Sequence, residues 1–233
     1  MSVRLGLVAT FVVACVMLAR GAAAAPAEDR LLPLELYSSD KARALATTHG
    51  GALRELNTGV YHCMPWVEIQ KHSIGFFRPK HVAGDVRYLS MRIYIEQDPS
   101  VEFARLRVEE RASAMFSRYV GPLLKRMTKD PAVATDPALD GFTIVLEWLK
   151  QTQRTAGDRP VHETIAIFID KPMARDYLAG GVPLAAMAAR ARVLGFDGET
   201  ALGPIRVAVW DDNFITTYKV ANYVLEPGVS CGG

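Results

Sequence analysis

The residues best suited to chemistry in this chain are a histidine and a cysteine that stand side by side. Residues 60–73 read VYHCMPWVEIQKHS, so His62 adjoins Cys63 and a second histidine, His72, follows nine residues after the cysteine. Cysteine nucleophiles use a neighbouring base, and both residue types are common zinc ligands. The stretch therefore presents three alternatives: a catalytic site, a metal site or a structural disulfide.

The spacing of the histidines disfavours a metal site. The chain has five of them: His49, His62, His72, His81 and His162. Zinc ligands usually occur in pairs roughly two to five residues apart, and no two of these histidines stand that close. We expect neither a metal nor a cofactor.

A disulfide explains Cys63 better than a nucleophile does. On a strand His62 and Cys63 would point to opposite faces, so the histidine would not activate the thiol. Two cysteines, Cys63 and Cys231, remain once a leader is removed, and an even count in an exported chain favours pairing. We assign no catalytic residue here.

The region around residue 77 is a candidate binding edge. Phe76 and Phe77 are consecutive and cannot both face inward on one strand, and basic residues follow them. An exposed ring beside cations is a modest signal of interaction. The candidate binding residues are His62, His72, Phe77 and His81.

Two acidic loops support a rival hypothesis. FDGE at 196–199 and WDDN at 210–213 gather carboxylates near the ends of predicted elements. Asp-Gly turn formation explains the first without a ligand. The alternative is a secreted hydrolase or metal-dependent enzyme that combines these loops with the histidines of 49–81.

The N-terminus is typical of an exported protein. Arg4 precedes an apolar run over residues 5–18, and the small-residue tract that follows suits signal peptidase. The run is shorter than the ~20 residues of a membrane span. We expect cleavage after Ala24 and a periplasmic or extracellular destination. A lipid anchor at Cys15, within VVAC, is the alternative.

The mature surface carries no net charge. Removing Arg4 and Arg20 from the 27 basic residues leaves 25, which equals the 25 acidic residues. Nonspecific nucleic-acid binding needs a cationic face, so we expect no nucleic-acid partner. Membrane contact is expected only through the leader or Cys15.

Hydrophobic spacing predicts the secondary structure. A helix starts after the N-cap Ser39 and stops near Gly59, with a kink at Gly50–Gly51, and short strands follow at 66–70 and 73–77. Further strands are predicted at 87–96, 141–151, 162–170 and 203–210. Helices are predicted from Pro99 to about 128, kinked at Gly121–Pro122, and over 171–180 and 182–195.

This order, β-α-β followed by β-α-β, predicts an α+β fold. We expect a ferredoxin-like βαββαβ sandwich over about 87–212, with the first and third strands central. An N-terminal helix and strands and a C-terminal strand would cover the open sheet face. The expected division is a signal peptide at 1–24, an N-terminal extension at 25–86 and the main domain at 87–233.

No motif in the chain demands catalysis. P-loop, G-x-G-x-x-G and G-x-S-x-G patterns are absent from the sequence. We therefore expect a non-enzymatic exported protein of the bacterial cell envelope or exterior that binds a protein or a small-molecule ligand.

Overall fold

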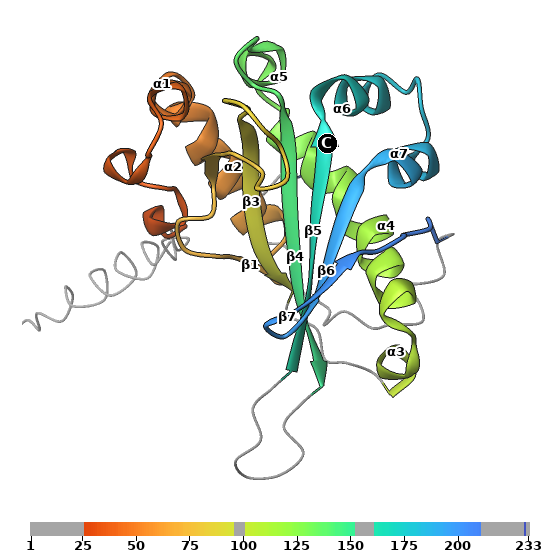
Figure 1. Ribbon diagram of the computed structural model, residues 1–233. Helices are drawn as coiled ribbons and strands as arrows, with labels where there is room; N and C mark the ends of the chain where they lie inside the picture. Colours follow the sequence, from red (N-terminus) through yellow and green to blue (C-terminus); the bar gives the residue numbers. More distant parts are fainter. Residues whose placement is uncertain (1–25, 96–100, 152–160, 211–230, 232–233) are drawn as a thin grey trace, which may run out of the picture.

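The computed structural model describes residues 26–95, 101–151, 161–210 and 231 (Figure 1). Several predicted features lie outside these residues: the leader with Cys15, the helix start at Asp98–Pro99, the acidic pair Asp211–Asp212 and the C-terminal strand. The described part has a mixed α+β fold, with seven α-helices and a seven-stranded, mostly antiparallel sheet.

The N-terminal part is helical, as the spacing predicts. After two 3-10 turns, Glu28–Arg30 and Leu34–Leu36, helix α1 spans Asp40–Thr48 and helix α2 spans Gly50–Cys63. The Ser39 side chain accepts a hydrogen bond from the Ala42 amide, which confirms the N-cap. The predicted stop near Gly59 is wrong, because α2 continues for another turn and buries Val60.

One sheet contains every strand of the described chain. The strands are β1 (Val67–Ile69), β2 (Gly75–Phe77), β3 (Tyr88–Ile95), β4 (Gly141–Gln151), β5 (Val161–Asp170), β6 (Arg192–Asp197) and β7 (Thr200–Pro204). Their spatial order is β1-β3-β4-β5-β6-β7, with β2 also paired to β3. The short strands β1 and β2 therefore extend the sheet at its edge and do not cover its open face.

The ferredoxin-like strand order is not confirmed. That order would place β5 between β3 and β4, whereas β3 pairs directly and in parallel with β4, from Tyr88–Gly141 to Ile95–Trp148. The crossover runs through α3 (Val101–Arg105), α4 (Val108–Met127) and α5 (Pro131–Thr135). Strand β4 takes a central position, and its Trp148 side chain is fully buried.

The second half of the chain also departs from prediction. Helices α6 (Lys171–Leu178) and α7 (Leu184–Arg190) are present, but residues 192–195 belong to β6 and not to a helix. Asp197 and Gly198, the latter at φ +57°, then turn the chain into β7. Pairing with β5 overrides the weak helical pattern of this stretch.

Only the first two residues of the predicted strand 203–210 belong to a strand. Beyond them, Ala208 N–H donates to the Ser113 hydroxyl at 3.0 Å and Trp210 N–H donates to the Ser117 hydroxyl at 2.9 Å. Both serines lie on α4. The two serine hydroxyls of α4 therefore accept hydrogen bonds from backbone amides that a neighbouring strand would accept in a sheet.

The core lies between one face of the sheet and the helices behind it in Figure 1, chiefly α4. Leu89, Ile93, Ile144 and Ile167 point to this side and are at most 1% exposed. Helix α4 continues through Gly121 and Pro122, and the interruption in this helical region falls between α3 and α4. The face turned to the viewer carries no helix among the described residues.

Candidate functional site

The five histidines lie on different elements. His49, at the junction of α1 and α2, is 5% exposed, and its Nε2 lies 2.7 Å from Asp136 Oδ2. This hydrogen bond lowers the pKa of Asp136. The pair connects the N-terminal helices to the end of α5, so His49 has a structural contact within the fold.

The candidate binding histidines are not brought together in a single cluster. His72 adopts φ 54° between β1 and β2, and its amide donates to the Asp29 carbonyl. His81 is exposed with its ring 4.5 Å from that of Phe168, and desolvation lowers its pKa. Phe77 is 36% exposed and its neighbour Phe76 only 2% exposed, so the two rings do face opposite ways.

A separate polar group lies on the open face of the sheet. Arg92 Nη2 donates to Glu147 Oε2 at 2.6 Å, and His162 Nδ1 lies 3.1 Å from the other oxygen of Glu147. Apart from this group, on the side of the sheet that carries Glu163, Asp197 of the acidic loop at 196–199 pairs with Lys150 at 2.7 Å. Among the described residues, no group of three or more His, Cys, Asp or Glu is arranged to hold a metal ion.

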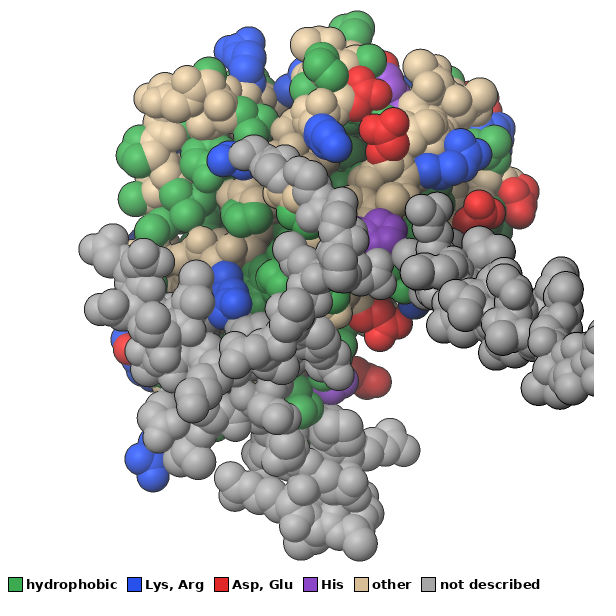
Figure 2. Space-filling view, turned by 180° about the vertical axis from the view of Figure 1, so that it is seen from behind, with side chains coloured by type: hydrophobic (Ala, Val, Ile, Leu, Met, Phe, Trp, Pro, Cys, Tyr) green, Lys and Arg blue, Asp and Glu red, His purple; other side chains and the backbone are tan. Residues whose placement is uncertain are grey.

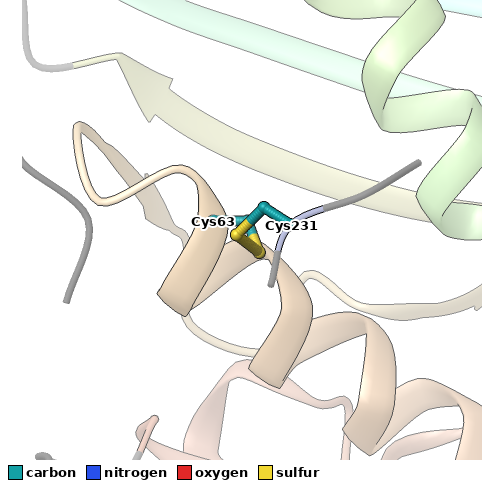
Figure 3. The surroundings of a disulfide bond; sticks show 2 residues. All are labelled: Cys63 and Cys231. Atoms are coloured by element: carbon teal, nitrogen blue, oxygen red, sulfur yellow. A yellow bond between two sulfur atoms is a disulfide. The ribbon is translucent and has the colours of Figure 1, made fainter. Parts of the chain in front are cut away.

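Cys63 and Cys231 form a disulfide, with their Cα atoms 5.5 Å apart (Figure 3). Cys63 is the last residue of α2, and not a strand residue as the sequence analysis assumed. The bond therefore attaches residue 231 to the C-terminal end of α2. His62, next to it, packs its ring edge-on against Tyr61.

A cavity of about 1110 Å³ opens beside this disulfide. It lies between the C-terminal halves of α2 and α4 and the helices α5 and α6, with Phe142 of β4 at its base. Both cysteines and His62 are among its lining residues. Small-ligand sites are typically cavities of about 300–1,000 Å³, so this one is large enough for a small molecule.

The charged residues that line the cavity are all basic. They are Lys125, Arg126, Lys129, Lys171 and Arg175. No aspartate or glutamate is among the described lining residues. In the view from behind, Lys and Arg side chains lie among hydrophobic ones on the described surface (Figure 2). Since the whole chain has a net charge of only +2, the positive charge here is a local concentration.

Arg126 stands out within this set. Its Nε is buried and has no hydrogen-bond partner among the described residues, and desolvation lowers its pKa. A guanidinium nevertheless stays protonated in proteins. A buried donor without a partner costs about 1–3 kcal/mol, so Arg126 is held in this position at some cost to stability.

The other cations of the cavity differ in their contacts. Lys171 Nζ donates to the Asp136 carbonyl, and Arg175 Nη2 lies 3.5 Å from Asp176 Oδ1. Lys125 and Lys129 are exposed and form no ion pair with a described carboxylate. Arg126, Lys125 and Lys129 therefore form no ion pair within the described part of the protein, although Arg126 and Lys129 also line a smaller neighbouring pocket with Glu55 and Asp130.

The remaining wall of the cavity is apolar or small. Pro122, Ala134, Phe142, Ala174, Tyr177 and Leu178 contribute to it. Gly121 allows Tyr177 to lie against α4, since a Cβ at position 121 would come within 2.5 Å of the Tyr177 hydroxyl. Burial raises the pKa of Tyr177. The cavity thus combines cations with a hydrophobic surface.

Of the candidate binding residues predicted from sequence, only His62 lines this cavity. The basic residues were missed because they come from two helices about 50 positions apart in the chain, 125–129 and 171–175. A sequence signal did exist: Lys125, Arg126 and Lys129 recur at the spacing of one helical turn next to the apolar stripe of α4. This spacing indicates a basic edge on the helix, but it does not predict which other helix lies opposite that edge.

Comparison with known proteins finds no matching family model, no similar curated protein and no similar solved structure. Separately, none of the helices in the described ranges has both the length and the apolar character needed to cross a membrane.

Proposed function

We propose that this chain is an exported, non-catalytic binding protein of the bacterial cell envelope or exterior, and that its ligand is a small molecule held in the cavity between α2, α4 and α6. The cavity is the observation that carries this proposal. It is about 1110 Å³ in volume, with a hydrophobic wall and several basic residues. Ligand sites commonly combine these properties.

The disulfide supports the location. Bonds of this kind persist in oxidising compartments such as the periplasm and the extracellular space. The Cys63–Cys231 bond lies at the cavity and joins residues 168 positions apart in the sequence. It is therefore compatible with a protein that is exported after removal of residues 1–24.

The test uses two fluorescent probes on the mature protein, residues 25–233, secreted from a bacterial host. One is the neutral N-phenyl-1-naphthylamine and the other is the anionic 1-anilinonaphthalene-8-sulfonate. We expect saturable binding of at least one probe with a stoichiometry near one. The intact mass of the secreted protein should match cleavage after Ala24; a diacylglyceryl mass on Cys15 would contradict the proposed leader.

The variant Ala134→Trp places a large ring at the cavity wall, while Ala132→Trp places one on the exposed side of the same helix, away from the cavity. We expect the first to weaken probe binding at least tenfold and the second to leave it within twofold of the wild type. Binding that is absent, or equally tight in both variants, would refute the cavity as the ligand site.

A further inference from the structure

We propose that the ligand is an anionic amphiphile, with a carboxylate or phosphate head and an apolar body, and that Arg126 pairs with its head. This inference rests on the proposed function, since it specifies the chemistry of the ligand in the same cavity. Three independent properties of the described lining support it: the sign of its charge, the state of Arg126 and the nature of the opposite wall.

The sign of the charge selects an anion. Five basic side chains line the cavity together with His62, and no described carboxylate lies among them. Cations that surround a partly enclosed space with low-dielectric walls produce a positive potential there. A cationic ligand would be repelled, and a neutral one would gain nothing from these charges.

Arg126 is the residue placed to receive the head group. Its Nε is buried without a described partner, whereas Lys171 and Arg175 already contact described oxygen atoms. The guanidinium also lies close to α2, with Nη1 3.6 Å from where a Cβ at Gly59 would be. Guanidinium groups bind carboxylates and phosphates through two parallel hydrogen bonds. An acidic head would pair with the terminal Nη1 and Nη2 atoms of this guanidinium.

Lys125 and Lys129 strengthen the same location. They flank Arg126 on α4 and at its C-terminal end, and both line the cavity. The last turn of α4 contains two of these cations, Lys125 and Arg126, next to the carbonyl groups that end the helix. As compact, mobile charges, lysines attract an anion without fixing its geometry. We therefore assign them a supporting role and the orienting role to Arg126.

The opposite wall selects an apolar body over a simple anion. Phe142 is fully buried at the base of the cavity, and the ring of Tyr177 and the side chains of Leu178 and Pro122 extend that surface. Burying apolar area contributes roughly 25 cal/mol per Å². Inorganic phosphate would use only the cations, while an acyl chain or aromatic body would use both parts of the cavity.

The experiment measures displacement of the bound probe from the mature, disulfide-intact protein by a matched series of ligands below their micellar concentrations. The anionic members are dodecanoate, dodecyl phosphate and a monoacyl lysophosphatidate. The neutral and cationic members are dodecanol and dodecyltrimethylammonium, and inorganic phosphate has no apolar body. We expect the anionic amphiphiles to bind at least tenfold more tightly than the other three, and with an affinity that falls as salt rises. The affinities of dodecanoate and lysophosphatidate distinguish a free fatty acid from a phospholipid as the source of the head.

Variants at position 126 test the role of the arginine. Arg126→Met keeps an apolar stem and removes the charge, and we expect it to bind dodecanoate at least tenfold more weakly with little change for dodecanol. Arg126→Lys restores the charge without the paired donors and should recover part of the affinity. Arg190→Met, which removes an exposed arginine of α7 away from the cavity, is the control and should bind as the wild type does. Circular dichroism checks that each variant is folded.

The outcomes separate the two proposals. If dodecanol displaces the probe as well as dodecanoate does, the cavity binds ligands but the anionic specificity is wrong. If Arg126→Met binds dodecanoate as tightly as the wild type, the assignment of the head group to Arg126 is wrong. If neither fluorescent probe binds to the cavity at all, the proposed function itself is refuted.

Discussion

Glu163 is the least exposed charged residue in the described structure. It lies on β5 and is 1% exposed, yet it is ionisable. Arg111 of α4, itself 4% exposed, donates from Nε to Glu163 Oε2 at 2.6 Å, and Trp148 Nε1 donates to the same oxygen at 3.1 Å. This buried pair connects the helix layer to the sheet beneath it. Removing one partner leaves the other charge buried.

Glu163→Gln should therefore lower the free energy of unfolding by about 3–5 kcal/mol, because the Arg111 guanidinium keeps its charge and loses its counter-ion. Urea unfolding followed by circular dichroism measures the change. Glu147→Gln is the matched control, since Glu147 pairs with Arg92 and His162 on the accessible face of the sheet. Partly exposed pairs contribute at most about 1 kcal/mol. Equal losses in the two variants would contradict the structural role of the Arg111–Glu163 pair.

At the scale of elements, α4 adjoins several parts of the fold: the sheet, the segment 208–210 and the cavity. One side of it covers the sheet, its serines bind the backbone of residues 208 and 210, and its C-terminal half forms a wall of the cavity. Its contact with α6 depends on Gly121, which leaves room for the Tyr177 hydroxyl. Alanine is favoured over glycine inside a helix by about 1 kcal/mol, so glycine at this position is explained by packing and not by helix formation.

Gly121→Ala should destabilise the protein by about 1–3 kcal/mol, because its Cβ would meet the Tyr177 hydroxyl and force α6 to move. Adding Tyr177→Phe removes that oxygen and should restore most of the stability. Gly51→Ala serves as the control: a Cβ there meets nothing within 4 Å, so the change should be neutral or stabilising. Thermal unfolding of the wild type, Gly121→Ala, Tyr177→Phe and the double variant measures the coupling, with Gly51→Ala as a fifth protein. Additive effects of the changes at 121 and 177 would argue against this contact.

At the scale of the whole molecule, the disulfide joins the C-terminal end of the chain to the N-terminal helices. Cys63 and Cys231 are 168 residues apart in sequence, so the bond closes most of the 233-residue chain into a loop. In the chain-entropy account such a loop restricts the unfolded state, by about 5 kcal/mol for this length. The bond also holds residue 231 at the cavity.

The double variant Cys63→Ser/Cys231→Ser should lose about 2–5 kcal/mol of unfolding free energy in guanidinium chloride. Adding a reductant should lower the stability of the wild type to a similar value and should not affect the variant. Thiol titration of the denatured, unreduced mature protein should detect no free cysteine. Two free thiols in the wild type, or a variant as stable as the wild type, would show that the bond does not stabilise the fold.

The amino-acid sequence by itself determined most of the local structure. Alternating apolar residues identify β3, β4 and β5, and the Ser39 cap identifies the start of α1, because these features depend on neighbours within one element. The even number of cysteines left after the expected leader favoured a Cys63–Cys231 pair, and the structure has this bond. Errors arose where the local pattern was weak, as at residues 192–195, which form a strand because β5 supplies the partner.

Only the tertiary structure decided the strand order and the position of the cavity. The observed fold and a ferredoxin-like fold have the same order of helices and strands along the chain. They differ in which strands pair, since β3 pairs with β4 here. Likewise, Arg126 and Tyr177 lie on different helices and line one cavity because α4 and α6 pack against the same face of the sheet. Such contacts depend on how distant segments pack together, and no spacing within a single segment encodes them.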